Sequence, residues 1–207
     1  MARIRIFDGT RNQKYGQALE AALNELSKLI PVKTKPRPGS IDMPGYELVK
    51  YLEQKSFNPD RGQVSRDRLL TLADKIPEIG GDRSTQKIIL VENDLYTPSV
   101  NWCFGGFTHF NGNDYIVIST ARIKNLLHFA DINIHELGHM SGAPRPGRSN
   151  TIEHLGTHCI NDLCVMQQKD TVEASVAYSR QRHQLKADSY CSQCKQDIIR
   201  YARHLPK

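Results

Sequence analysis

Five consecutive residues, His135-Glu136-Leu137-Gly138-His139, constrain this 207-residue chain more than any other feature of its sequence. Residues four apart share one face of an α-helix, so both imidazoles can bind the same zinc ion. Glu136 then lies beside the metal, where it can take a proton from a zinc-activated water. The motif therefore predicts a helix over residues 126–140 that carries a zinc site.

A catalytic zinc site usually has three protein ligands, and the sequence offers more than one third ligand. Gly142 follows His139 by three residues, and a glycine there lets the helix turn away so that a later side chain returns to the metal. The candidates are the two nearest downstream histidines, His154 and His158, and a glutamate on a later predicted helix, Glu173.

The cysteines form a second set of potential metal ligands. Cys159, Cys164, Cys191 and Cys194 have the Cys-x4-Cys and Cys-x2-Cys spacings of a closed structural zinc site. Cys103 lies outside this set and is expected to be a buried small residue. We find no apolar core of a signal peptide and no membrane-spanning run, which favours a cytoplasmic protein whose clustered cysteines bind metal.

Composition is that of an ordinary soluble globular protein. The chain has 28 Lys and Arg against 22 Asp and Glu, a formal charge of +6, and 39% apolar residues. These values exclude collagen-like and disordered chains. Basic residues near the C-terminus are interpreted as solvated helix faces, with an acidic substrate or nucleic acid as the alternative; they are Arg145, Arg148, Arg180, Arg182, His183, Lys195, Arg200 and Arg203.

The order of predicted elements indicates an α/β fold with a small irregular C-terminal lobe. Thr10–Gln13 has a capping-box pattern, and the helix that follows ends at Pro31, where an extended connection to Pro44 begins. Strands are expected at 2–7, 87–92, 100–104 and 115–119, the last two separated by a turn that includes His109. Helices are expected at 45–55, 64–76 and 126–140, and a basic helix at the C-terminus.

The motifs together resemble the archaemetzincin family. Its signature is a metzincin His-Glu-x-x-His-x-x-Gly-x-x-His, a cysteine directly after the third histidine, then x4-Cys-x-Met and a later Cys-x-x-Cys. The residues that match in order are His135, Glu136, His139, Gly142, His158, Cys159, Cys164, Met166, Cys191 and Cys194. Upstream stretches at 57–63, 94–96, 101–105 and 119–122 also look like the family.

The resemblance implies a zinc-dependent metallopeptidase, either an endopeptidase or an aminopeptidase, that acts on a peptide or protein substrate. It implies a metzincin-like mixed twisted sheet over the active-site helix, within one catalytic domain over residues 1–207. The N-terminal subdomain would end with that helix at residue 142, and residues 143–207 would form a zinc-stabilised subdomain.

The family's residue roles carry over to two zinc ions per chain. His135, His139 and His158 would hold the catalytic ion, with Glu136 as general base. The ligands of the structural ion would be Cys159, Cys164, Cys191 and Cys194. Met166 would form the Met-turn beneath the metal, and residues 100–105 would resemble the edge strand along which an extended peptide lies.

One departure from the family concerns the third histidine. Gly142 and His158 have 15 residues between them, where the signature has two, and the expected position holds Arg145. Such an insertion is thermodynamically cheap, because the entropy of loop closure grows only logarithmically with length. The bond between His158 and Cys159 is kept, so we prefer His158 to His154 and Glu173.

Two other functions fit parts of the pattern. A SprT-like peptidase or a basic zinc-stabilised module would associate with nucleic acid, and SprT-like proteins also join His-Glu-x-x-His to a Cys-rich zinc element. A catalytically silent scaffold with the same fold is the other alternative, given the displaced histidine. The sequence leaves open the substrate, the oligomeric state and the role of residues 143–157.

Overall fold

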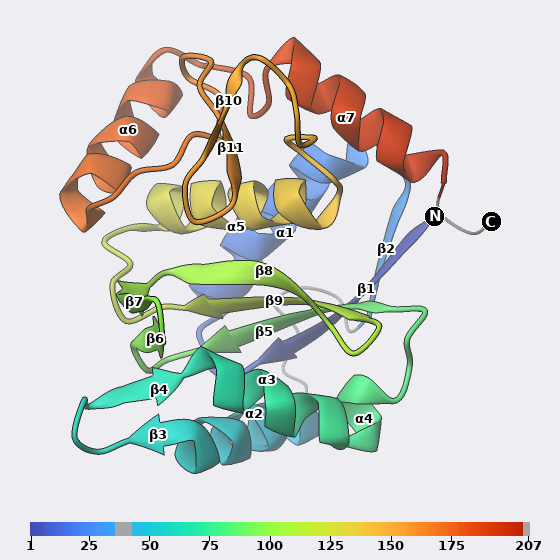
Figure 1. Ribbon diagram of the computed structural model, residues 1–207. Coiled ribbons are helices and arrows are strands. Elements are labelled where there is room, and N and C mark those ends of the chain that lie inside the picture. Colours follow the sequence, from blue (N-terminus) through green and yellow to red (C-terminus); the bar gives the residue numbers. More distant parts are fainter. Residues whose placement is uncertain (36–42, 205–207) are drawn as a thin grey trace. The chain divides into compact units, whose positions relative to one another are not determined.

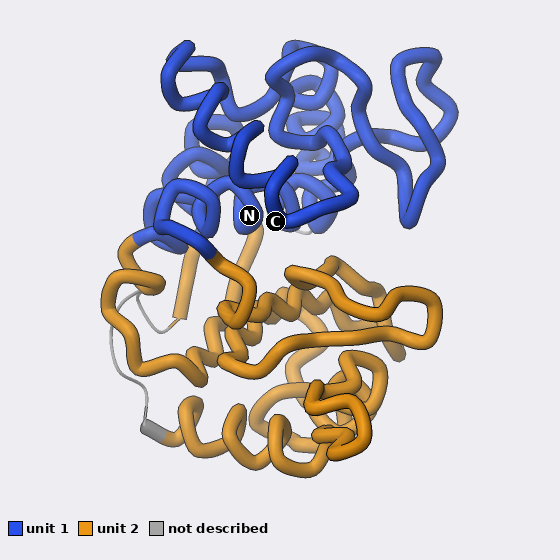
Figure 2. Tube along the Cα trace, turned by 90° about the vertical axis from the view of Figure 1, so that its left-hand side faces the viewer, with its two compact units in different colours: residues 1, 18–32, 124–207 blue, residues 2–17, 33–123 orange. Residues whose placement is uncertain are grey.

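The computed structural model describes residues 1–35 and 43–204 of the chain. Figure 2 shows two compact units, one of residues 1, 18–32 and 124–207 and the other of residues 2–17 and 33–123. Helix α1 (Gln13–Ser27) begins in the second of these units and continues into the first.

A five-stranded sheet forms the centre of the unit that contains most of the N-terminal half. Figure 1 shows its strands, and their order is β2-β1-β5-β9-β8. Strands β1, β5 and β9 are parallel, and β8 runs antiparallel to β9. The strands are β1 (Ala2–Asp8), β2 (Val32–Lys35), β5 (Gln86–Val91), β8 (Gly105–Phe110) and β9 (Asn113–Ser119).

Three helices and a smaller sheet complete this unit. Helices α2 (Met43–Ser56) and α3 (Arg66–Lys75) pack on the large sheet, and the short α4 (Pro77–Gly80) follows α3. Their apolar faces bury a core that includes Phe7, Leu52, Leu69 and Val117. The smaller sheet has the order β3-β4-β6-β7 and consists of β3 (Phe57–Asn58), β4 (Gln63–Ser65), β6 (Leu95–Thr97) and β7 (Val100–Cys103).

The strand predictions are confirmed except in one region. Residues 105–110, expected to be a turn, form strand β8, so His109 lies on a strand and contacts Asp114 at 2.8 Å. The turn itself is Asn111-Gly112, whose φ angles of +49° and +81° suit a tight hairpin. Strands β7 and β8 each end the order of their own sheet.

The start of α1 differs in detail from the capping-box prediction. Asn12 caps the helix, because its Oδ1 accepts from the amide of Lys14 at 3.1 Å, while Thr10 Oγ1 accepts from Asn12 itself at 3.2 Å. The extended connection predicted from Pro31 to Pro44 includes strand β2, and Pro44 already belongs to α2. The part of that connection at 36–42 lies outside the described residues.

The other unit contains the predicted motif helix and everything after it. Helix α5 covers Leu126–Met140, as the sequence predicts, and Asn125 caps it by accepting from the amide of His128 at 2.9 Å. The elements after α5 are β10 (Thr151–Glu153), β11 (Thr157–Cys159), α6 (Val172–Gln184) and α7 (Ser192–Ala202). Among the described helices, we find none with the length and apolar character needed to span a membrane.

The observed division falls before α5, not after residue 142. The reason is that α5 packs against α6, and Tyr190 from the later segment donates to the carbonyl of Ile134 on α5 at 2.7 Å. The motif helix and the cysteine-rich segment therefore share one unit, and they can be compared directly.

Candidate functional site

The C-terminal end of α5 carries two of the predicted zinc ligands. His135 and His139 are one helical turn apart, with ring centroids separated by 4.7 Å. The helix stops directly afterwards: Gly142 has a φ of +78°, and the amide of Ala143 donates to the carbonyl of Gly138 at 2.9 Å. This is the hydrogen bond of a glycine-capped helix end, so the turn predicted at Gly142 is confirmed.

The residues after that turn fold into a β-hairpin that returns to the helix. Strands β10 and β11 pair antiparallel, with Ile152 opposite His158. Gly156, at the bend, has a φ of +120°, which favours glycine. This geometry brings His158, only 3% exposed, to the histidines of α5, with its ring centroid 5.0 Å from that of His139.

The three imidazoles face one another through the same type of atom. His139 Nε2 lies 3.0 Å from His135 Nε2 and 3.3 Å from His158 Nε2. The other ring nitrogens of His135 and His158 face the backbone carbonyls of Val165 and Gly156, at 2.8 and 3.1 Å. Carbonyls only accept, so these Nδ1 atoms donate and the Nε2 atoms carry the lone pairs that a metal needs.

The protonation states also suit metal binding. Burial lowers the pKa of His135 and lowers that of His158 to about 4. Burial, with the charges of the two neighbouring histidines, holds the pKa of His139 well below its ordinary value. All three imidazoles are therefore neutral at pH 7, the state in which histidine binds metal.

The spacing of the nitrogens fits zinc. Tetrahedral coordination with Zn–N bonds of about 2.0–2.1 Å places the ligand nitrogens about 3.3 Å apart. The measured Nε2–Nε2 distances of 3.0 and 3.3 Å match this value. Three lone pairs that converge at such distances repel one another unless a cation lies between them, so the donor set fits a zinc ion.

Glu136 lies next to this histidine cluster. Its side chain is largely buried, and its charge raises the pKa of His158, against the larger opposite effect of burial. A carboxylate in this position is within electrostatic reach of whatever the three imidazoles hold.

The two alternative third ligands lie elsewhere. His154 lies in the bend between β10 and β11, with 54% of its side chain accessible, and pairs with Asp170 at 3.4 Å. Glu173 is exposed in the first turn of α6. Within the described residues, His158 is the third histidine that the fold brings to His135 and His139.

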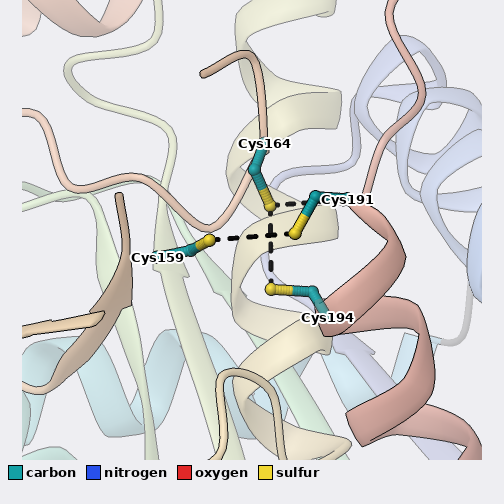
Figure 3. Close-up of side chains that lie close together, drawn as sticks. All are labelled: Cys159, Cys164, Cys191 and Cys194. Atoms are coloured by element: carbon teal, nitrogen blue, oxygen red, sulfur yellow. Dashed lines mark hydrogen bonds between the residues drawn. The ribbon is translucent and has the colours of Figure 1, made fainter. Parts of the chain in front are cut away.

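Four cysteine side chains point toward one another in the same unit, as Figure 3 shows. The sulfur of Cys159 is 3.8 Å from that of Cys191, and the sulfurs of Cys164 and Cys194 are 3.7 Å apart. Tetrahedral Zn–S bonds of about 2.3 Å place the sulfurs about 3.8 Å apart. All five cysteines lie in the described part of the chain and none forms a disulfide, so the set fits a second zinc ion.

Backbone and side-chain N–H groups surround these sulfurs. Asn161 donates its backbone amide to Cys159 at 3.4 Å and its side-chain amide to Cys191 at 3.2 Å. The amide of Cys191 donates to Cys164 at 3.4 Å. Such donors stabilise thiolates, the form that binds metal.

Met166 packs against α5 at Gly138. A methyl group on Gly138 would lie 2.3 Å from Met166 Sδ and 3.0 Å from Tyr190 Cε1. Only a glycine allows this approach, which explains the residue inside the helical motif. The backbone carbonyl of Met166 also accepts from the amide of Cys159 at 2.9 Å, so one residue contacts both the motif helix and the cysteine set.

The interpretation of the basic residues is wrong at two positions. Arg182 is buried, with Nε 3.5 Å from the carboxylate of Asp131 on α5. Arg148 is largely buried and pairs with Asp197 at 2.6 Å. Neither belongs to a solvated helix face. Sequence reasoning missed both pairs because each aspartate lies about fifty residues from its arginine, with no local pattern to connect them.

The upstream family-like stretches meet within the other unit. Asp94 accepts from Arg122 at 2.6 and 2.8 Å and from Gln63 at 2.8 Å. Gln63 also donates to the carbonyl of Asn101 at 2.8 Å, and the Arg122 guanidinium lies over the ring of Trp102. Stretches that are weak signals individually thus form one hydrogen-bonded network. Cys103 is partly buried beside it and packs against that unit's core.

Comparison with known proteins finds a relative of this chain. An archaemetzincin of Nanoarchaeum equitans is 31% identical over 144 residues, which cover 70% of this chain and 67% of the relative. No family model matches the chain.

Solved structures resemble the fold over nearly the whole chain. The crystal structure of an archaemetzincin from Methanopyrus kandleri matches with a TM-score of 0.63 and 19% identity. The match covers 98% of this chain and 96% of the archaemetzincin chain. A zinc-dependent peptidase from Methanocorpusculum labreanum has a TM-score of 0.60 and 18% identity, over 94% of this chain and 99% of its own. The predicted α/β fold with a cysteine cluster in the C-terminal part is therefore confirmed.

Proposed function

The chain belongs to the archaemetzincin family, and from this premise we propose that it is a zinc-dependent metallopeptidase with Glu136 as its general base. The observation that carries the proposal is the convergence of three neutral imidazoles at tetrahedral spacing beside that glutamate. A relative named archaemetzincin and a structural neighbour described as a zinc-dependent peptidase support the same class of activity.

The histidines supply the metal site. His135, His139 and His158 would hold one zinc ion through their Nε2 atoms. The Val165 and Gly156 carbonyls fix two of these rings by accepting from Nδ1. When bound, the metal supplies Lewis acidity to the scissile carbonyl and to the attacking water.

Glu136 moves the proton. Its carboxylate takes the proton from the attacking water and delivers it to the nitrogen of the leaving amine, so that the peptide bond breaks to give an acid and an amine. Burial of Glu136 beside the histidine cluster keeps the carboxylate at a fixed position for both transfers.

The cysteines have a structural role in this proposal. Four thiolates fill all the positions of a tetrahedral ion and leave none for a substrate. The protein would then hold two zinc ions per chain, one catalytic and one structural, and the fit of both donor sets supports this count.

The test is a comparison of wild type with Glu136→Gln, which keeps the shape of the side chain and removes the base. We expect two zinc ions in both proteins by elemental analysis. Hydrolysis of a fluorogenic peptide library should fall by about 10²–10⁴-fold in the variant. Hydrolysis at the wild-type rate by Glu136→Gln would contradict the assignment of the base.

The same library separates endopeptidase from aminopeptidase activity. An aminopeptidase needs the free amino group of its substrate, whereas an endopeptidase does not. Each peptide is therefore assayed with and without an N-terminal acetyl group. Cleavage of the acetylated set at an equal rate identifies an endopeptidase, and its complete resistance identifies an aminopeptidase.

A further inference from the structure

The segment inserted before His158 (residues 143–157) is anchored at its beginning to the cysteine set. Arg148, in this segment, donates from one guanidinium nitrogen to Cys194 Sγ at 3.4 Å and from the other to Asp197 Oδ2 at 2.6 Å. Asp197 lies on α7, three residues after Cys194, and its Oδ2 also accepts from the backbone amide of Arg145 at 2.9 Å. The carboxylate thereby holds the guanidinium against the sulfur.

The position of this guanidinium has an electrostatic consequence. Four thiolates around a divalent zinc ion carry a net charge of −2, and the sulfur-bearing residues are largely buried. A buried charge is costly unless nearby groups compensate it. Amides from Asn161 and Cys191 serve three of the sulfurs, at 3.2–3.4 Å. Cys194 instead receives the cationic donor, and charged donors form stronger hydrogen bonds than amides.

The same residue leads directly to the proposed catalytic ligand. The carbonyl of Arg148 accepts from Thr151 Oγ1 at 2.7 Å, at the first residue of β10. Strand β10 pairs with β11, where Ile152 lies opposite His158. A short chain of contacts thus runs from the cysteine set, through Arg148, to the hairpin that carries His158.

We propose that Arg148 is a positioning residue that binds the inserted segment to the four-cysteine zinc site and protects the Cys194 thiolate. The segment then connects the two metal sites rigidly. Its first residues, fixed through Arg145 and Arg148, do not act as a mobile lid. This inference rests on the proposed function, because it takes the cysteines to hold zinc.

The test uses Arg148→Met, which removes the charge and the donors at similar side-chain length. The matched control is Arg145→Met, which removes the same charge from an exposed side chain of the same segment. Zinc release from the native proteins is followed with a chromophoric chelator, first alone and then with a small thiol-modifying reagent. The increase in the rate of zinc release that the thiol-modifying reagent causes reports on the cysteine site.

We expect this increase to be about tenfold larger in Arg148→Met, the effect of losing one charge-assisted hydrogen bond, and unchanged in Arg145→Met. Release by the chelator alone, which reports on the histidine site, should also be faster in Arg148→Met. Arg148→Lys, which keeps the charge without the two-pronged geometry, should be intermediate, and it serves as the test if Arg148→Met does not fold.

The contrary outcomes separate this inference from the proposed function. If the wild type holds zinc on the cysteines and the Arg148 variants release it at the wild-type rate, the inference is overturned while the metallopeptidase proposal stands. If the wild type holds no zinc on the cysteines, the premise fails and the inference fails with it. Peptide hydrolysis by the wild type, measured in parallel, reports on the catalytic site independently.

Discussion

The histidine cluster and the cysteine cluster lie in the same unit and have the same tetrahedral spacing, yet their surroundings are opposite. Each cysteine sulfur accepts from an N–H group, including those of Asn161 and Arg148. Each imidazole instead makes a hydrogen bond with the protein backbone. The partners of His135 and His158 are the carbonyls of Val165 and Gly156, and that of His139 is the backbone of Ala143. Donors around a ligand stabilise its negative charge, whereas acceptors behind an imidazole keep a neutral lone pair directed at the metal.

The number of ligands differs as well. Four cysteines complete a tetrahedron, so the metal that they hold has no position for chemistry. Three histidines leave one position of a tetrahedron open, and Glu136 is largely buried next to this cluster. Two donor sets in one unit thus suit a structural ion and a catalytic ion respectively, and removing parts of each should have different consequences.

The largest expected effect comes from Cys194→Ser. A structural zinc ion contributes about 10–16 kcal/mol of apparent binding free energy in small zinc domains, so losing one of its four ligands should cost several kcal/mol of stability. We expect one zinc ion fewer and a large decrease in Tm by circular dichroism.

The control for this substitution is Cys103→Ser, which changes a cysteine that lies outside the cluster. It should keep both zinc ions and nearly the wild-type Tm. A Cys194→Ser protein with the wild-type Tm and zinc content would contradict the claim that the four cysteines hold a structural zinc ion.

The next effect belongs to the histidine side. His158→Ala should empty the catalytic site on dialysis, because a direct ligand is worth more than the 10–100-fold in metal affinity that supporting residues contribute. Peptide hydrolysis should disappear while the cysteine site keeps its zinc. His154→Ala and Glu173→Ala are matched controls and should retain two ions. Two zinc ions in His158→Ala would refute the ligand assignment.

How far the sequence predicts these sites depends on whether the signal is local. Helix α5 is predicted correctly because the His-Glu-x-x-His motif and Gly142, the glycine that follows it, are local signals. The third ligand is a different matter. His154 and His158 are four residues apart on one hairpin, and the pairing register that places Ile152 opposite His158 decides between them. From the sequence, only the family resemblance favoured His158, because the signature has a cysteine directly after the third histidine and Cys159 follows His158.

Strand β8 was missed for a similar reason. Two glycines at its start suggest a turn, but a methyl group on Gly105 would lie 2.2 Å from the carbonyl of Val117 on the neighbouring strand. The glycine is therefore required by the close approach of β9, a contact that is not visible in the local sequence. The buried pairs of Arg148 and Arg182 were missed because their partners are equally remote.

A smaller effect is expected from Gly138→Ala, which tests how Met166 connects the two sites. The new methyl group would meet Met166 Sδ at 2.3 Å inside a packed interior, and such overpacking costs about 1–3 kcal/mol. Part of this cost is offset by the better helix propensity of alanine, about 1 kcal/mol. We therefore expect a net loss of about 1 kcal/mol in urea denaturation and faster release of the histidine-bound zinc.

A double-mutant cycle with Met166→Ala provides the control. Removing the methionine side chain removes the atoms that the new methyl group meets, so the two costs should not add. Additivity within about 0.5 kcal/mol would mean that Gly138 is not needed for the contact with Met166.

Acid sensitivity is an effect that appears only below neutral pH, and it separates burial from metal binding on the histidine side. His128, on α5 but outside both clusters, is fully buried, and burial lowers its pKa from 6.5 to about 4. Between these two pH values the unfolded chain binds a proton that the folded chain does not. The free energy of unfolding therefore decreases as the pH falls from about 6.5 to about 4, with no contribution from this residue above that range.

His128→Gln removes this titration without touching either metal cluster. One proton is worth about 1.4 kcal/mol per pH unit. Between pH 7.5 and pH 5 the wild type should therefore lose up to about 2 kcal/mol more stability than the variant in urea denaturation. An equal pH dependence in the two proteins would show that His128 does not contribute. The three clustered imidazoles, which burial also keeps neutral, would then be the next groups to test by substitution.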